Sequence, residues 1–169
     1  MSSQLHAFAF QTGSWRVRHR KLGNRLAGCT DWIEFGGTCH ARELLGGAGN
    51  VDDFLIDDPA GVYRAATFRR LDVTADEWLI YWADARGDGL DPPMRGRFDD
   101  GVGVFWGKDV HAGRDVQVRF VWSGIASDSA RWEQAFSLDG ETWEVNWIMH
   151  FNRDHRNATV EGSLGGSKQ

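Results

Sequence analysis

The sequence predicts an all-β fold, a single closed antiparallel up-and-down barrel of about ten strands with a short N-terminal helical turn. Short alternating apolar segments fill most of the chain, and no apolar stripe of helical period is long enough for a packed helix. Glycine is abundant (21 residues) and proline is scarce (3 residues), and the glycines stand between the strand-like segments as turn residues. Gly13-Ser14-Trp15 opens the first strand and Arg153 closes the last, so a Trp can lie under an Arg where the two ends of the sheet meet.

The elements follow from the alternation of apolar and polar residues along the chain. The helical turn is expected from Leu5 to Thr12, and the barrel domain is expected to span residues 1–160. The small polar segment 161–169 is expected to be a disordered tail. Strands are expected near 14–22, 30–35, 38–45, 51–57, 62–72, 77–85, 94–99, 102–108, 115–123, 130–137 and 142–152.

Four turn sequences predict how these strands pair. Gly36-Gly37 is interpreted as a two-residue hairpin loop, which places Cys29 too far from Cys39 for a disulfide, so two free thiols are expected. Asp100-Gly101, Ala112-Gly113 and Asp139-Gly140 predict three further hairpins. The expected pairs are Phe98 with Gly103, Arg95 with Trp106, Phe105 with Phe120, Trp106 with Arg119, Phe136 with Trp143, and Trp132 with Trp147.

This register separates an apolar face from a polar face, and the apolar face is predicted to line the barrel. Val104, Trp106 and Val121 fall on the outer face and form either a surface patch or a contact with a second copy of the chain. The parity of the strands between residues 30 and 85 stays open. The predicted inner residues are Trp15, Val17, His19, Met94, Phe98, Phe105, Val118, Phe120, Trp122, Trp132, Gln134, Phe136, Trp143, Val145, Trp147, Met149 and Phe151.

Composition excludes several classes of function. The net charge is -5 and the pI is about 5.6, and no basic block is available to neutralise phosphates, so neither a nucleic acid nor a membrane is an expected partner. The first ten residues lack a leader pattern and no apolar run approaches a membrane span, so a cytoplasmic location is expected. The histidines and cysteines lack metal-ligand spacing, so neither a metal nor a cofactor is expected.

Four segments together resemble a known family. They are Gly13-Ser14-Trp15-Arg16-Val17-Arg18, Gly46-Gly47-Ala48-Gly49-Asn50-Val51-Asp52, Arg131-Trp132-Glu133-Gln134-Ala135-Phe136 and Trp143-Glu144-Val145-Asn146-Trp147. With the late Arg153 they resemble the calycin superfamily of lipocalins, fatty-acid-binding proteins and nitrobindins. The pattern is most similar to uncharacterised bacterial calycin-like proteins of a domain-of-unknown-function family. The resemblance implies a barrel that encloses a ligand cavity, without implying a reaction.

A nitrobindin-like haem site is an open alternative within that resemblance. The chain departs from the nitrobindin pattern, because Arg16-Val17-Arg18 follows the first Trp where that family is expected to carry a longer glycine-rich motif. A haem also needs a neutral imidazole that points into the cavity. His150 lies near the matching end of the chain but has outward parity.

Three functions remain open at this stage. The first is binding of a small apolar or aromatic molecule inside the barrel. The second is a small cofactor-independent enzyme of the cyclase, isomerase or hydrolase type, in which His19 or Asp84 acts as general acid or base. The third is a homodimeric interaction module built on the outer patch. The candidate ligand-binding residues are His19, Tyr63, Trp82, Phe98, Phe105, Phe120, Trp122, Gln134, Trp147 and Met149.

Overall fold

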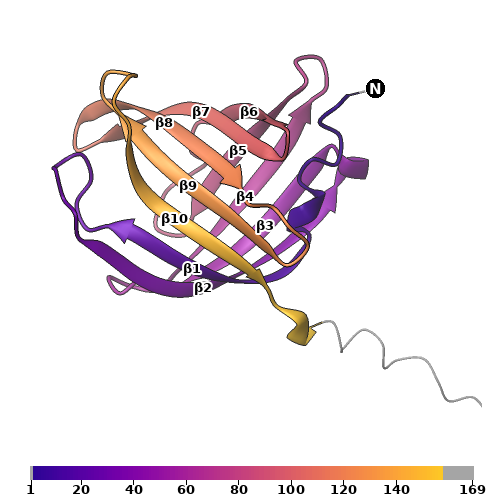
Figure 1. Cartoon of the computed structure of the whole chain (residues 1–169), viewed down its shortest axis with the longest axis horizontal. Helices are drawn as coiled ribbons and strands as arrows, with labels where there is room; N and C mark the ends of the chain where they lie inside the picture. Colours follow the sequence, from indigo (N-terminus) through magenta and orange to yellow (C-terminus); the bar gives the residue numbers. More distant parts are fainter. Residues whose placement is uncertain (1, 158–169) are drawn as a thin grey trace, which may run out of the picture.

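The protein forms a closed barrel of ten antiparallel strands, seen here in a computed structural model that describes residues 2–157. Each strand pairs with the next along the chain, and β1 pairs with β10 to close the sheet (Figure 1). The fold is therefore the predicted all-β up-and-down barrel, and the predicted tail at 161–169 lies outside the described residues. The elements are η1 (Ala9–Gln11), β1 (Gly13–Leu22), β2 (Trp32–Leu44), η2 (Leu45–Gly47), β3 (Gly49–Ile56), β4 (Tyr63–Asp72), β5 (Glu77–Asp84), β6 (Met94–Asp99), β7 (Val102–His111), β8 (Arg114–Ser123), β9 (Ser129–Ser137), β10 (Glu144–Arg153) and η3 (His155–Asn157).

The two ends of the sheet meet at Trp15 and Arg153, which are direct partners across β1 and β10. The Arg153 guanidinium lies 4.1 Å from the centroid of the Trp15 ring, the arrangement that the sequence predicts. It also donates hydrogen bonds to the carbonyls of Phe10, Thr12 and Ser127. Gly13 has a φ of +112°, and a Cβ there would lie 2.8 Å from an Arg153 nitrogen, so this closure requires glycine.

The segment before β1 closes one end of the barrel (Figure 1). Phe8 is 1% exposed, and its ring packs edge-on against Trp78 at 5.0 Å and Phe98 at 4.9 Å between centroids. The Gln4 side chain hydrogen-bonds both the N–H and the carbonyl of Phe98, and the Trp78 indole donates to the Gln4 carbonyl. We call residues 2–12 the plug, since their apolar side chains fill this end of the barrel and Gln4 hydrogen-bonds it to β6.

The predicted hairpin at Gly36-Gly37 is wrong, because both glycines lie inside the single long strand β2. A tight two-residue hairpin needs positive φ angles, and neither glycine has one. They pair instead with β1, Gly37 opposite Val17 and Gly36 opposite Arg18. A Cβ on Gly37 would lie 2.5 Å from the Leu55 carbonyl oxygen and 3.1 Å from Nε2 of His19, so the glycine makes room for the His19 ring. Cys29 and Cys39 are free thiols, as predicted.

The pairs predicted from Asp100-Gly101 and Ala112-Gly113 are confirmed, including Arg95 with Trp106 and Phe105 with Phe120. The register predicted from Asp139-Gly140 is wrong. Asp139 accepts hydrogen bonds from the backbone of Glu141 and Thr142 and from the Ser137 hydroxyl, which makes a wider loop. Phe136 therefore pairs with Glu144, and a bulge between Val145 and Trp147 then places Trp132 opposite Met149.

The bulge decides which side chains of β10 face inward. Before the bulge, the pairing of β10 with β9 is one residue away from the predicted register, so the predicted inner residue Trp143 lies outside. Its ring is 5.4 Å from the Trp106 ring and 4.8 Å from the Arg119 guanidinium. After the bulge the displacement is two residues, which restores the predicted inward parity of Trp147 and Met149. Asn146, the extra residue, is buried where the sequence predicted an outward residue. The outer patch thus gains Trp143, and the homodimer stays a prediction.

Candidate functional site

The barrel wall is open at the end opposite the plug. β5 and β6 pair only from Trp78 to Ile80, so the last part of β5 and the last part of β7 have no β6 backbone between them. The loop of residues 85–93 crosses this opening, and Asp91 donates its N–H to the Trp82 carbonyl. We call this opening, with the neighbouring ends of β1, β4 and β10, the mouth.

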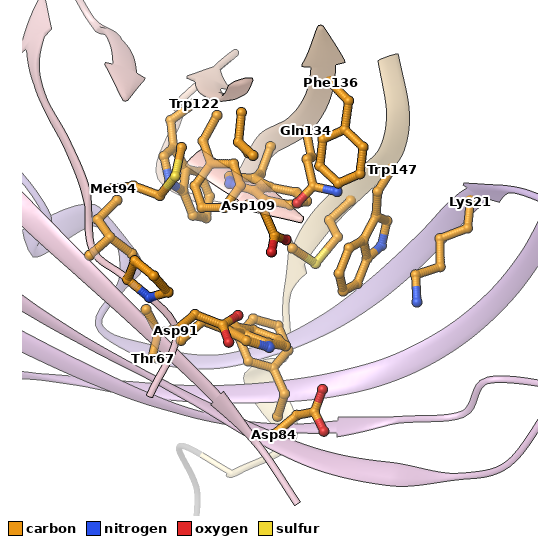
Figure 2. A pocket seen from close by; sticks show the side chains of 18 of the residues that line it. Lys21, Thr67, Asp84, Asp91, Met94, Asp109, Trp122, Gln134, Phe136 and Trp147 are labelled. Carbon is orange, nitrogen blue, oxygen red and sulfur yellow. The ribbon is translucent and has the colours of Figure 1, made fainter. Parts of the chain in front are cut away.

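A cavity of about 220 Å³ lies inside the barrel behind the mouth (Figure 2). An apolar cavity of about 150 Å³ accommodates benzene, so this chamber has room for a ligand somewhat larger than one ring. Most of its deep lining is aromatic or aliphatic, and most of the charge lies at the mouth. The lining residues are Lys21, Arg25, Phe54, Tyr63, Thr67, Arg69, Ile80, Trp82, Asp84, Arg86, Asp91, Pro92, Met94, Lys108, Asp109, Val118, Phe120, Trp122, Trp132, Gln134, Phe136, Trp147 and Met149.

Three tryptophans form the walls of this chamber. The ring of Trp147 stands perpendicular to Trp82, with centroids 6.1 Å apart at 87°, and to Trp132, at 5.5 Å and 89°. Phe120 extends the wall by an edge contact with Trp132 at 4.8 Å. Perpendicular rings present both a face and an edge to the space between them, which suits a flat ligand that stacks on one wall and meets the edge of the next.

Seven of the ten residues predicted to bind a ligand line the cavity: Tyr63, Trp82, Phe120, Trp122, Gln134, Trp147 and Met149. Phe98 and Phe105 do not line it, because the plug covers them: both pack against Phe8. His19 does not line it either, since it lies behind Trp147. The roles of all ten in binding stay predictions.

His19 is a buried neutral base that orients a wall residue. Its Nδ1 accepts a hydrogen bond from the Trp147 indole at 3.1 Å, and its ring stacks on Phe35 at 4.9 Å. Burial, aided by the nearby Lys21 charge, lowers the pKa of His19 to about 4. The proton of the neutral ring is therefore on Nε2, which has no hydrogen-bond partner within residues 2–157.

Asp84, the other candidate catalytic residue, lines the mouth as an ionised group. Its carboxylate accepts hydrogen bonds from Arg86 through the backbone N–H at 2.8 Å and the guanidinium at 3.0 and 3.2 Å. These contacts hold the pKa of Asp84 below its ordinary value. The Arg86 guanidinium in turn lies 3.5 Å from the centroid of the Tyr63 ring. The pair fixes Tyr63 at the edge of the mouth.

Gln134 brings one polar group into the aromatic chamber. Its amide nitrogen donates to Oδ1 of Asn146 at 2.9 Å, and both side chains are buried. The bulge of β10 is what turns Asn146 inward to receive this bond. The Gln134 amide oxygen thus remains available to accept a hydrogen bond from a ligand (Figure 2).

Apart from Asp84, the sequence prediction missed the charged residues of the mouth. Lys21 has the same inward parity on β1 as Trp15 and His19, a signal that could have found it. Arg25 lies in the loop between β1 and β2, where no periodicity indicates a direction. Asp91 and Asp109 extend their carboxylates into the same space, as Figure 2 shows. Burial, with Asp109 nearby, raises the pKa of Asp91.

A second missed feature is a buried polar network beside the plug. The Arg69 guanidinium lies 2.7 Å from Asp52 and donates to Asn50 at 2.6 Å, and Asp52 also accepts from Gln11 and from the Thr67 backbone. Arg69 lines the cavity and stacks over Phe8 at 4.8 Å. The network therefore links the inner end of the chamber to the plug.

The residues of the chamber do not fit a haem. None of the lining residues is a histidine, His150 is exposed on the outer face, and Nδ1 of His19 is already bonded to Trp147. Within residues 2–157 no group of three or more histidine, cysteine, aspartate or glutamate side chains is placed to hold a metal ion. No helix in this described part of the chain is long and apolar enough to cross a bilayer.

Comparison with known proteins finds solved structures with a similar fold. The crystal structure of Rv2717c from M. tuberculosis matches with a TM-score of 0.61 over 92% of this chain and 99% of that chain. The two sequences are 12% identical over the match, so the likeness shows a shared fold. No protein-family model matches the sequence, and no curated protein matches it.

Proposed function

We propose that this protein is a calycin-like barrel that binds a small apolar or aromatic molecule in its chamber. The observation that carries the proposal is the chamber of about 220 Å³ walled by Trp82, Trp132 and Trp147 and open at one end of a closed barrel. Packing defects in protein interiors are small, whereas this cavity lies beside the place where β5 and β6 stop pairing, as a ligand site with an entrance would.

The energetics favour a ligand with one or two rings. A ring system that buries ~200 Å² of apolar surface gains about 5 kcal/mol, and edge or stacking contacts with the tryptophans add ~1 kcal/mol each. Ordering of the ligand removes part of this gain, so the proposed affinity is in the micromolar range. The Gln134 amide oxygen can accept a hydrogen bond from a ligand that carries an N–H or O–H at the matching position, without requiring one.

The contacts support binding over catalysis. The enzyme hypothesis needs His19 or Asp84 as a proton-transfer group that reaches a substrate. His19 lies behind Trp147, and Asp84 is held ionised by Arg86. His19 is therefore out of reach of a substrate in the chamber, and the paired, ionised Asp84 is left only the role of a weak base, so neither candidate can supply a general acid.

Isothermal titration calorimetry with 2-naphthamide, a neutral flat probe, tests this proposal. Val118 lines the chamber, so Val118→Phe should fill it and weaken binding at least tenfold. Val110 is exposed on the barrel surface, so the matched Val110→Phe should bind like the wild type. Absence of binding to the wild type, or equal binding by both variants, would reject the chamber as a ligand site. Native mass spectrometry of the purified protein adds an independent search for a retained molecule.

A further inference from the structure

Three cations gather around Tyr63 at one side of the mouth. The Lys21 amine lies 3.4 Å from the Tyr63 hydroxyl and 4.1 Å from the centroid of the Trp147 ring. The Arg86 guanidinium lies over the Tyr63 ring, and the Arg25 guanidinium lies 5.4 Å from the centroid of Phe136. All three side chains line the same chamber as Trp147.

Only two of these three cations have a carboxylate partner. Lys21 lies 3.5 Å from Asp58, and Arg86 lies 3.0 Å from Asp84. Within residues 2–157, no carboxylate oxygen lies within 4.0 Å of the Arg25 guanidinium, and Arg25 makes no side-chain hydrogen bond. Asp109 and Glu144 act on Arg25 only from beyond that distance, and Glu144 already accepts from the Leu26 N–H at 2.7 Å. Arg25 therefore has no direct ion-pair partner among residues 2–157.

These charges are also withdrawn from water. The Lys21 side chain is 16% exposed, and Arg25 is half-buried. Burial lowers the pKa of both groups, and the Arg25 charge further lowers the pKa of Lys21. Keeping two desolvated cations together costs free energy, and an anion placed between them would offset it.

Two carboxylates, with Lys108 beside one of them, also line the mouth. Asp91 and Asp109 come from the 85–93 loop and from β7, whereas Lys21 and Arg25 come from β1 and the loop that follows it. Figure 2 shows Lys21 beside Trp147, with Asp91 and Asp109 in a separate part of the lining. Asp91 and Asp109 repel an anionic group, so an anion at the mouth is favoured beside Lys21 and Arg25.

We propose that the ligand is an aromatic acid, whose ring lies in the tryptophan chamber and whose carboxylate binds between Lys21 and Arg25. This inference rests on the proposed binding function and names the chemical class of its ligand. The unpaired Arg25 presents a planar set of donors that matches the two oxygens of a carboxylate, and the Lys21 amine adds a point charge. The ring then stacks on the Trp147 wall beside which Lys21 already lies.

The test compares 2-naphthoate with its neutral isostere 2-naphthamide by calorimetry on the wild-type protein. A charge-assisted pair of this kind is worth a factor of about ten or more in affinity, so naphthoate should bind at least tenfold more tightly than the amide. Arg25→Gln should remove that advantage while changing the affinity for the amide less than about twofold. Arg42→Gln is the charge-matched control, since Arg42 is exposed on β2 and does not line the chamber. It should leave both affinities unchanged.

If the amide binds as tightly as the acid, the anion site is rejected and the chamber survives as a neutral site. If neither compound binds, the proposed binding function itself fails. If Arg42→Gln weakens naphthoate as much as Arg25→Gln does, net charge accounts for the effect and the specific site is rejected. Lys21→Met is a second variant at the same site, and it should also reduce the preference for the acid; an unchanged preference in both variants overturns the assignment.

Discussion

The indole N–H of Trp147 donates a hydrogen bond to Nδ1 of His19 across 3.1 Å, from one strand of the closure to the other. This bond orients the wall residue of the chamber from behind, because Trp147 lines the cavity and His19 does not. Gly37 completes the arrangement, since only a residue without a Cβ leaves room for the His19 ring. The orientation of Trp147 in the chamber wall thus depends on His19 and Gly37, which do not line the cavity.

The buried neutral His19 predicts a pH-dependent stability. Its pKa is about 4 in the folded protein and about 6.5 in the unfolded chain. Between these values the unfolded chain takes up a proton that the folded protein does not, so stability is lost as the pH falls from 6.5 to 4. The full loss is about 3 kcal/mol. Urea unfolding between pH 4 and 7.5 measures it, and His19→Gln should reduce the slope because glutamine keeps an acceptor without titrating. An equal slope in the variant would contradict this account.

The surroundings of Gly37 predict that alanine destabilises the protein there but not at the neighbouring Gly36. Gly37→Ala places a Cβ 2.5 Å from the Leu55 carbonyl oxygen, which is backbone and cannot easily move, so a loss of about 1–3 kcal/mol in stability is expected. Gly36→Ala is the matched control. Its Cβ would meet only an Asp57 oxygen at 4.0 Å, so it should be neutral or slightly stabilising. Thermal or urea unfolding of both variants checks this, and similar effects at the two sites would rule the explanation out.

Much of the fold could be predicted because its turns and parity are local signals. Asp100-Gly101 and Ala112-Gly113 gave the correct register of β6, β7 and β8, since short loops determine which residues face each other. Parity then placed Phe120 and Trp122 toward the chamber correctly. These inferences need nothing beyond the period of two residues in a strand.

The errors arise where a tertiary contact overrides a local signal. Gly36-Gly37 has the composition of a hairpin loop, yet the contact of Gly37 with His19 and Leu55 is what requires glycine there. The bulge at Asn146 is stabilised by a hydrogen bond to Gln134 on the next strand, which no single-strand pattern shows. Arg25 lies in a loop, where periodicity carries no information, so this charge of the mouth was missed.

Because Arg153 contacts both Trp15 and the plug, its replacement should lower the stability of the protein and loosen the plug together. Arg153→Gln removes the contact with Trp15 and leaves the carbonyls of Phe10 and Thr12 without their donor, so a loss of about 2–4 kcal/mol is expected. Hydrogen exchange measures the second effect, which is faster exchange of the amides in residues 5–12. Arg156→Gln is the control, because within residues 2–157 Arg156 pairs only with its near neighbour Asp154, and this variant should have little effect. Destabilisation without faster exchange in the plug would show that Arg153 does not hold it.

The buried ion pair of Asp52 and Arg69 predicts that removing one charge costs more stability than removing both. Asp52→Asn leaves the Arg69 guanidinium buried without its counter-charge at 2.7 Å, so a loss of about 3–5 kcal/mol in stability is expected. The double variant Asp52→Asn with Arg69→Met removes both charges and should recover part of that loss. Urea unfolding of the single and double variants completes a double-mutant cycle. A coupling free energy near zero would contradict the pairing. Arg69 also lies on Phe8 and lines the chamber, so each single variant should also weaken the binding of naphthamide. If the double variant recovers stability but not binding, the support that Arg69 gives to the plug is separate from its effect on the shape of the chamber.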